Sequence, residues 1–213
     1  MRWRWFDPLR RGWLLYHLTD PHFAFMYDPP PAGEWVALDC ETTGLDVRRD
    51  KIISIGAVRI VGNRLLTSQR LELLVRPERA LKANSVRVHR LREQDVAQGI
   101  HPEQAMRRLL DFIGSRPLVG YYLEFDVAML NREIWRLLGV HLPQPKIEVS
   151  SMYYDFKNRQ LPPHQRGGTI DLRFATMMND LALPLRDAHD ALSDAVMAGL
   201  AFLKLRRLLG SLN

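Results

Sequence analysis

The sequence predicts an α/β fold in which a mixed five-stranded sheet is flanked by helices and preceded by an N-terminal arm. Three strand-like stretches follow Glu34, a mostly helical region follows Pro77, and two short apolar strands interrupt that helical region. The resulting order, βββ-α-β-α-β-α, is typical of one mixed sheet covered by helices. At 213 residues the chain is long enough for one sizeable core.

The arm comprises residues 1–33, which differ in composition from the rest of the chain. It holds three of the five Trp residues and closes with the prolines of residues 29–31, which are typical of a stiff linker. Apolar spacing predicts a short helix over Pro8 to Leu18 with Trp13, Leu14 and Leu18 on one side. Because exposed aromatic residues promote aggregation, we expect the arm to pack on its own domain. A docking segment for a protein partner or a membrane surface is the alternative.

The first three strands follow the arm directly. Their sequences are EWVALDC, KIISIGAVRIVG and residues 64–75, all rich in β-branched or apolar side chains. Gly62 and Asn63 form a two-residue junction that favours a tight hairpin. These stretches therefore predict an antiparallel start to the sheet.

The remaining segments alternate between helix-like spacing and short apolar runs. Pro117 to Gly120 and Lys146 to Val149 are the two short strand candidates. Apolar spacing predicts the helices at residues 92–98, 102–114, 124–138, 151–157, 169–181 and 189–208. No internal repeat or low-complexity tract interrupts this pattern.

Composition restricts the possible function classes. A lone cysteine, Cys40, excludes an internal disulfide framework and a multi-cysteine zinc site, so any metal must be held by oxygen or histidine. No apolar run approaches the roughly 20 residues that cross a bilayer, and charged residues interrupt the N-terminus, so we expect a cytoplasmic protein without membrane attachment. The net charge of +6 favours a polyanionic partner. A GC-rich genome would also explain why 25 of the 30 basic residues are Arg.

The first acidic motif, VALDCETTG, ends the first strand. Adjacent side chains of a strand point to opposite faces, so Asp39 and Glu41 share one face while Cys40 points away. Two like charges this close are best tolerated where a cation neutralises them, and oxygen ligands favour Mg²⁺ or Mn²⁺. A solvated pair on an edge strand is the alternative.

The residues after this pair form a turn with possible substrate contacts. Thr42, Thr43 and Gly44 offer hydroxyls, backbone N–H groups and close approach, which suit a sugar or phosphate. Leu45 then follows as a side chain that could wedge against a base. An ordinary glycine turn explains the same residues without a ligand.

Two further acidic motifs lie in the helical half. Asp126 falls near the start of the helix at 124–138, where the helix dipole favours a negative charge. In RDAHDALSDAV, we expect Asp190 to cap the last helix, Asp194 to point into the site and His189 to precede the helix. A histidine beside carboxylates can take a proton from water. Each motif taken alone is also compatible with a structural role.

Taken together, the motifs D-x-E-T-T-G, Phe125-Asp126 and His189-x4-Asp194 resemble those of the DEDDh exonucleases. This group includes the proofreading subunit of bacterial DNA polymerase III, ribonuclease T and oligoribonuclease. The resemblance spans roughly residues 35–205 and implies a ribonuclease H-like fold, with residues 34–213 as the exonuclease domain. It implies 3′-5′ hydrolysis of single-stranded DNA or RNA to 5′ mononucleotides by two Mg²⁺ or Mn²⁺ ions. The residues implied are Asp39, Glu41, Asp126 and Asp194 as metal ligands and His189 as general base.

The resemblance also suggests substrate contacts. The segment around His89 and Leu91 is similar to the family's H-G-I segment beside the terminal nucleotide, although Arg90 replaces the glycine. Leu45, Leu91 and Phe125 are candidates for contacts to terminal bases, since stacking tolerates any base. Phe125 is equally well explained as a core residue. Where the family commonly has H-N before the second motif, this chain has Tyr121-Tyr122.

A basic loop lies between the predicted helices at 151–157 and 169–181. Residues 156–168 include Arg159, Arg166 and two consecutive glycines, and we expect this loop to flank the substrate channel and contact phosphates. A solvated surface loop is the alternative. The sequence also leaves open a catalytically impaired binding module, a polymerase-associated module that docks through residues 1–33, and a homodimer.

Overall fold

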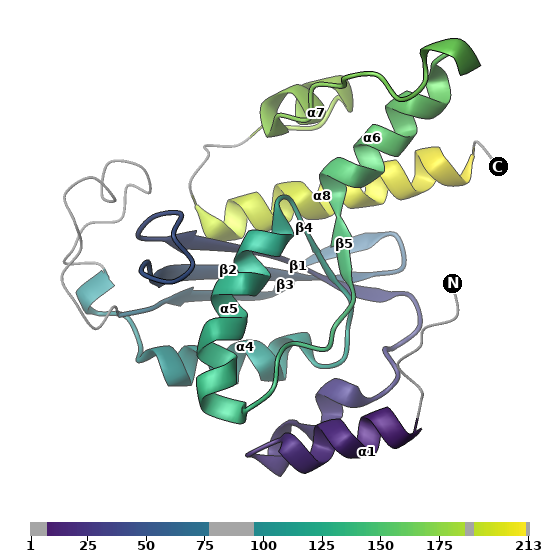
Figure 1. Cartoon of the computed structure of the whole chain (residues 1–213). Helices are drawn as coiled ribbons and strands as arrows, with labels where there is room; N and C mark the ends of the chain where they lie inside the picture. The colour runs from purple at the N-terminus through teal and green to yellow at the C-terminus, as the bar shows by residue number, and fades with distance from the viewer. Residues whose placement is uncertain (1–7, 77–95, 186–189, 212–213) are drawn as a thin grey trace.

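The computed structural model describes residues 8–76, 96–185 and 190–211 (Figure 1). The N-terminal region contains α1 (Pro8–His17) and the 3-10 helix η2 (Pro21–Tyr27). The strands are β1 (Glu34–Thr42), β2 (Ile52–Val61), β3 (Arg64–Leu74), β4 (Leu118–Gly120) and β5 (Lys146–Glu148). The later helices are α4 (Pro102–Ile113), α5 (Leu123–Leu138), α6 (Val149–Gln160), η3 (Pro163–Gln165), α7 (Phe174–Asp180) and α8 (Ala191–Gly210).

The five strands form one mixed sheet in the order β3-β2-β1-β4-β5. β1 pairs antiparallel with β2, and β2 pairs antiparallel with β3. β1, β4 and β5 run parallel to one another, because helical connections return the chain to the same edge each time. The predicted fold class is therefore confirmed, and β1 is the central strand.

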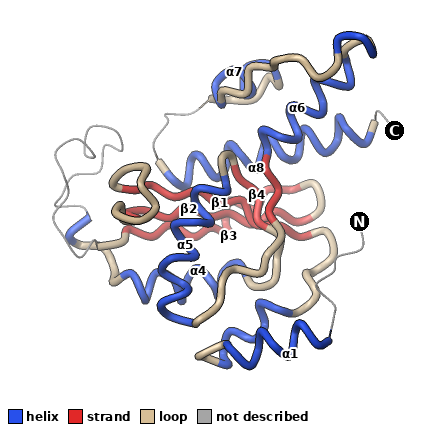
Figure 2. The backbone as a smooth tube through the Cα atoms, viewed as in Figure 1, coloured by secondary structure: helices blue, strands red, loops and turns tan. Residues whose placement is uncertain are grey.

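Helices cover both faces of the sheet (Figure 2). Val36, Leu38 and Cys40 of β1 pack in a core with α4, α5 and the N-terminal region. Ala37 packs in the second core, to which α6, α7 and α8 contribute. Side chains alternate along β1, so Asp39 lies on the face that α8 covers.

The hairpin between β2 and β3 has the predicted tight turn. Val61 and Arg64 are register partners, which leaves Gly62 and Asn63 as the connecting residues. Gly62 has φ 59°, a left-handed conformation that glycine adopts without a steric penalty. The antiparallel half of the sheet therefore follows from local sequence.

The described part of the N-terminal region packs against the main core. Leu18, Phe23 and Met26 are buried there. The Thr19 N–H donates to the Leu138 carbonyl at 3.0 Å, which fixes the segment to the end of α5. Trp13 differs from expectation because its side chain remains 60% exposed.

Several helix boundaries differ by a few residues from those that the sequence predicts, and the start of α7 differs most. α7 begins at Phe174 instead of residue 169, because the Asp171 carboxylate accepts bonds from the Arg173 N–H and the Thr176 hydroxyl. Such local side-chain bonds compete with helix formation. α6 begins at Val149, two residues early, where the Glu148 carboxylate accepts from the Ser150 N–H. The expected helix at 92–98 falls largely outside the described residues.

No helix in the described ranges combines the length and the apolar character that a bilayer span requires.

Candidate metal-binding active site

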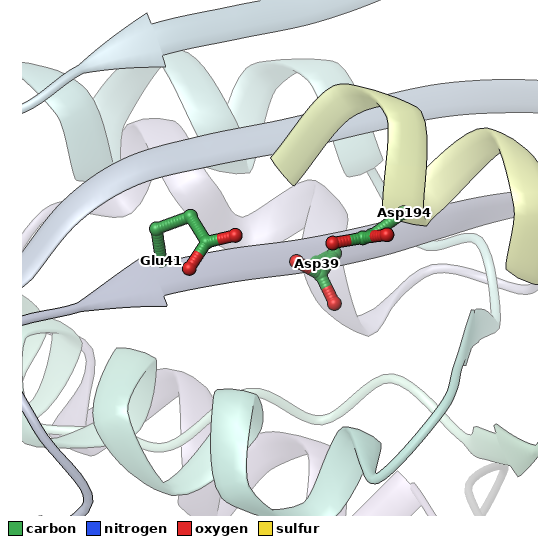
Figure 3. A group of neighbouring side chains, drawn as sticks. All are labelled: Asp39, Glu41 and Asp194. Atoms are coloured by element: carbon green, nitrogen blue, oxygen red, sulfur yellow. The ribbon is translucent and has the colours of Figure 1, made fainter. Parts of the chain in front are cut away.

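Three carboxylates converge where β1 meets the start of α8 (Figure 3). Asp39 and Glu41 lie on β1, and Asp194 lies in the first turn of α8. One carboxylate oxygen from each residue lies within 4.8 Å of the other two. The structure thus brings together side chains that are more than 150 positions apart in the sequence.

A glycine in β2 permits this convergence. Gly56 is the register partner of Asp39 across the β1–β2 ladder. A Cβ atom added at Gly56 would lie 2.2 Å from the backbone of Ala191 and Leu192, at the beginning of α8. The start of α8 therefore rests directly on β2, which carries Asp194 to β1. The sequence offered a signal for this contact, since a glycine inside an apolar strand often marks a close backbone approach.

The beginning of α8 has the predicted cap. The Asp190 carboxylate accepts from the Ser193 N–H at 3.0 Å, so Asp190 closes the helix end as expected. Asp194 follows in the first turn, where the N-terminal end of the helix dipole favours an anionic side chain. The cap and the dipole both support a carboxylate at this position.

Asp126 reaches the same region from α5. Its side chain is only 4% exposed, and its carboxyl accepts a hydrogen bond from the Cys40 N–H. Because β4 pairs with β1 at Val36 and Ala37, the Cys40 N–H lies beyond that ladder and is available to Asp126. Asp126 lies outside the group of three converging carboxylates, but its charge acts on Asp39.

The site has a strong excess of negative charge. Burial, together with the charges of Asp126 and Asp194, raises the pKa of Asp39 well above its ordinary value. Burial also raises the pKa of Asp126, and the Glu41 charge adds to this effect. The repulsion falls if a cation binds among these oxygens.

The ligand set suits a hard divalent cation. Among the described residues the converging group contains carboxylates alone, and carboxylate oxygens are the ligands that Mg²⁺ and Mn²⁺ prefer. Cys40 lies next to the site in sequence, but its side chain is buried on the other face of β1, and burial and nearby carboxylates raise the pKa of its thiol. A protonated, buried thiol is a poor metal ligand.

Comparison with known proteins identifies the family. The family model described as "RNase_T: Exonuclease" matches residues 36–202, which include all three acidic motifs. This chain belongs to that exonuclease family. The match covers both the sheet and the helices that carry the carboxylates.

Relatives of this chain include bacterial polymerase subunits. A DNA polymerase III subunit epsilon-like protein of Rhodobacter capsulatus is 30% identical over 80% of this chain, which spans only 23% of that protein. The DNA polymerase III subunit epsilon of Aquifex aeolicus is 24% identical over 88% of this chain and 87% of its own length. The chain therefore matches a part of one relative and nearly the whole of the other.

Solved structures share the exonuclease fold at low identity. An E. coli exonuclease I complex with single-stranded DNA aligns with TM-score 0.68 and 16% identity over 85% of this chain and 43% of that one. Exonuclease X in complex with 5′ overhanging duplex DNA aligns with TM-score 0.62 and 20% identity over 83% of this chain and 93% of that one. The ribonuclease H-like arrangement of the sheet and helices is thus shared.

Three residues that the sequence singled out lie outside the described residues. They are His189, the candidate general base, and the candidate substrate contacts His89 and Leu91. Each stays a prediction from the sequence.

The hydroxyls of the Thr-Thr-Gly turn form hydrogen bonds within the loop. The Thr42 hydroxyl donates to the Gly44 carbonyl at 2.7 Å, and the Thr43 hydroxyl donates to the Asp50 carboxylate at 2.9 Å. A Cβ atom at Gly44 would lie 2.6 Å from that carboxylate, so a side chain there would displace Asp50 from its bond with Thr43. The hydroxyls therefore stabilise the loop, and their expected contact with a sugar or phosphate stays a prediction from the sequence.

An arginine on α5 fixes the same loop. Arg132 donates to the carbonyl oxygens of Val47 and Asp50 and also pairs with Glu133 at 2.9 Å. Leu45 stands on this braced loop with 85% of its side chain exposed. Sequence reasoning missed Arg132, because nothing in its local pattern shows that it contacts a loop more than 80 residues away.

Phe125 is half-buried, and it packs against the core that α4 and α5 share. This position fits a core residue whose exposed part can still touch a ligand beside Asp126. Both predicted roles of Phe125 are therefore compatible with the structure.

The basic loop lies away from the carboxylates. Figure 1 shows the end of α6 and η3 near the C-terminal end of α8, whereas Asp194 lies in its first turn. Within the loop, the Arg166 side chain donates to the Leu161 carbonyl at 3.1 Å, and Asn158 accepts from the Gly167 N–H at 2.8 Å. α6 carries the loop away from these carboxylates, which argues against the expected place of Arg159 and Arg166 beside the substrate channel.

Proposed function

We propose that this chain is a metal-dependent 3′-5′ exonuclease that releases 5′ mononucleotides from single-stranded nucleic acid. The convergence of the Asp39, Glu41 and Asp194 oxygens within 4.8 Å carries the proposal, because a phosphodiester can be hydrolysed where divalent cations bind. Membership of the exonuclease family supports the same reaction class. The domain that performs it would comprise residues 34–213, after an arm of residues 1–33.

Each of the four acidic residues would be a ligand of the cations. Asp39, Glu41, Asp126 and Asp194 would hold two Mg²⁺ or Mn²⁺ ions, with Asp39 between Glu41 and Asp194 (Figure 3). Glu41 and Asp194 would support activation of the attacking water, and Asp126 would support departure of the leaving group. When bound, such ions lower the pKa of the attacking water and neutralise charge on the phosphate and the leaving oxygen. His189 would accept the proton of that water, as an imidazole can near neutral pH.

The loop after β1 would recognise the unpaired 3′ end of the nucleic acid. Leu45 is exposed on a loop that Arg132 and Asp50 hold in place, so it can insert beside a terminal base without reordering the backbone. Phe125 offers a partly exposed ring next to Asp126. Contacts of this apolar kind accept any base and favour an unpaired 3′ end.

The direct test uses end-labelled oligonucleotides and a purified full chain with Mg²⁺ or Mn²⁺. The substrate panel contains single-stranded DNA, single-stranded RNA and blunt duplex DNA at one salt concentration. A 5′ label should give a ladder that shortens one nucleotide at a time, and Asp39→Asn should abolish it. Internal cleavage, or equal activity of Asp39→Asn, would overturn the proposal.

A second role is proposed for the N-terminal arm, which is docking to a protein partner such as a replicative polymerase subunit. Trp13 and Trp135 are exposed and line a cavity of about 450 Å³ between α1 and the end of α5. Exposed tryptophans are typical of interface hot spots, and the epsilon-subunit relatives suggest the polymerase.

Copurification of the full chain with its own organism's polymerase III catalytic subunit tests this role. Trp13→Ala combined with Trp135→Ala should abolish copurification while the exonuclease ladder is retained. Light scattering of the full chain without the polymerase subunit shows whether the same surface instead forms a homodimer. A complex that survives the double substitution would exclude the cavity as the docking surface.

A further inference from the structure

Tyr122 has an unusual backbone conformation. It is the residue that precedes α5, with φ 54° and ψ 32°, and 64% of it is exposed. A bulky side chain rarely adopts the left-handed region, where asparagine and glycine are favoured. Since the Tyr122 ring gains little burial there, the core does not explain why this position carries a tyrosine.

One carboxylate holds the Tyr122 backbone. Glu148, the last residue of β5, accepts from the Tyr122 N–H at 3.1 Å and from the Leu123 N–H at 2.9 Å. It also accepts from the N–H and the hydroxyl of Ser150, at 3.1 and 2.7 Å. Glu148 thus closes the beginnings of α5 and α6 at once and keeps the Tyr122 backbone in place.

The position of Tyr122 is close to the acidic site. β1 and β4 run parallel, so the loops that leave their C-terminal ends lie at the same edge of the sheet. Tyr122 immediately precedes α5 and Asp126 lies in the first turn of that helix, so both residues belong to the same strand-to-helix junction. The charge of Glu148, which binds the Tyr122 N–H, also acts on Asp126.

A second tyrosine braces the ring. Tyr121 contacts Tyr122 edge to face with ring centroids 4.6 Å apart. The Tyr121 hydroxyl donates to the Leu172 carbonyl at 3.0 Å, and its ring contacts Phe174 at 4.7 Å. The Tyr122 ring therefore has a fixed neighbour on one side and is open to solvent elsewhere.

We propose that Tyr122 is a stacking platform for a base of the bound nucleic-acid strand, at the same edge of the sheet as Leu45 and the carboxylates. This inference rests on the proposed function and adds a residue that selects for unpaired bases. Leu45 follows β1 and Tyr122 follows β4, and both are exposed apolar side chains at the edge where the carboxylates lie. A ring held by its backbone can stack on a base without first losing conformational freedom.

The test measures coupling between the ring and individual bases. Fluorescence anisotropy with Ca²⁺ in place of Mg²⁺ gives the Kd of the full chain for single-stranded oligonucleotides that carry one abasic site, moved stepwise from the 3′ end. For the unaltered protein, the Kd should rise roughly 5- to 100-fold when the abasic site removes the stacked base. Tyr122→Asn should weaken binding of the intact strand by a similar factor and should lose the response to that abasic site.

Two variants control for folding and for general effects. Tyr122→Phe retains the ring and should keep the abasic response, whereas asparagine suits the left-handed backbone, so Tyr122→Asn should keep its Tm. Tyr16→Ala removes another exposed tyrosine, on α1, and should leave every Kd unchanged.

An identical abasic profile in the unaltered protein and Tyr122→Asn would overturn the stacking role. Failure of the proposed function would look different, because the unaltered protein would then produce no ladder with Mg²⁺ on any strand. If the unaltered protein produces the ladder but Tyr122→Asn does not change the response to the abasic site, only the stacking role of Tyr122 is rejected.

Discussion

Asp39 is the residue on which the charges of four neighbouring carboxyl groups act. Its position between Glu41 and Asp194 creates repulsion that the fold must tolerate when no cation is bound. A site of this kind lowers the stability of the metal-free protein in order to bind a cation tightly. Substitution of Asp39 should therefore change the stability of the metal-free protein and its metal binding in opposite directions.

Asp39→Asn should stabilise the protein in EDTA and remove its response to Mn²⁺. The amide keeps the shape of the side chain while it removes one of the repelling charges. Differential scanning calorimetry should give a Tm several degrees higher than that of the unaltered protein, since about 1 kcal/mol shifts the Tm by roughly 2–4 °C in a chain of this size. Added Mn²⁺ should raise the Tm of the unaltered protein only. A lower Tm for Asp39→Asn in EDTA would contradict this electrostatic account.

The metal-free protein should also lose stability as the pH rises. A carboxyl whose pKa is raised in the folded state favours folding while it is protonated, and this contribution is lost as the pH passes the raised pKa of Asp39. Between pH 4.5 and 8 in EDTA, the Tm of the unaltered protein should therefore fall relative to that of Asp39→Asn. A difference in Tm that does not change with pH would show that Asp39 is ionised throughout.

Single residues were predicted well where the reason is local. Strand alternation alone places Asp39 and Glu41 on one face, and the helix-capping pattern identifies Asp190. At Gly44 the sequence predicts close approach of a ligand, and the structure adds that the Asp50 carboxylate, from the other end of the same loop, lies beside this glycine. The structural role of a glycine depends on which atoms lie beside it in the fold. The residues next to the glycine in the sequence do not reveal those atoms.

At the scale of elements, the contact between β2 and α8 determines whether the site forms. Gly56 lets the backbone of Ala191 approach the strand, and Asp194 follows three residues later. A side chain at this position would meet backbone, which cannot rotate away as the end of a flexible side chain can. The helix would have to move.

Gly56→Ala should lower kcat by about 100-fold while the protein remains folded, because a displacement of roughly 1 Å in a catalytic group can cost this much. The affinity for Mn²⁺, measured by calorimetry, should fall with it. Gly12→Ala on α1 is the matched control, since a Cβ atom there meets nothing within 4 Å and alanine favours the helix. Full activity of Gly56→Ala would show that α8 can shift without opening the site.

The contact between α5 and the loop after β1 gives a second element-scale prediction. Arg132→Ala removes the donors that the Val47 and Asp50 carbonyls share, so it should destabilise the protein by roughly 1–3 kcal/mol and raise KM for oligonucleotides. Urea unfolding and steady-state kinetics measure the two effects.

Arg136→Ala is the control for that experiment. Its side chain is mostly exposed and pairs with Glu133 at the surface, so its loss should change stability by less than about 0.5 kcal/mol. Equal effects of the two substitutions would mean that Arg132 acts through its charge alone.

Among the elements, the sheet followed from the sequence more closely than the helix boundaries did. All five strands were predicted because apolar runs and the Gly62 turn are local signals. The start of α7 was placed too early, since the bonds of Asp171 compete with the helix in a way that apolar spacing does not show. η2 was missed because a 3-10 turn capped by Asp20 has no clear periodicity.

At the scale of the whole molecule, the functional residues gather at one end of the sheet and the basic loop lies toward the other. α8 begins beside β1 and ends near η3 (Figure 1). A 20-residue helix is about 30 Å long, so a short strand bound at the carboxylates does not reach Arg159 or Arg166. The sequence could not show this, because the direction of α6 depends on packing against α8.

Arg159→Ala combined with Arg166→Ala should therefore leave the salt dependence of KM for a trinucleotide unchanged. The slope of log KM against log salt concentration counts the phosphate contacts that the protein makes. A flatter slope for the double variant would show that Arg159 or Arg166 contacts substrate phosphates.

The central claim is that Asp39, Glu41, Asp126 and Asp194 bind divalent cations at one site. Anomalous diffraction from a crystal of the full chain soaked in Mn²⁺ tests it most directly. The structure predicts Mn²⁺ peaks bound to Asp39, with oxygens of Glu41, Asp126 and Asp194 completing the ligand set. The claim would be contradicted if no Mn²⁺ bound to Asp39. It would also be contradicted if Mn²⁺ bound there but the carboxylates of Asp126 or Asp194 lay far from the ions.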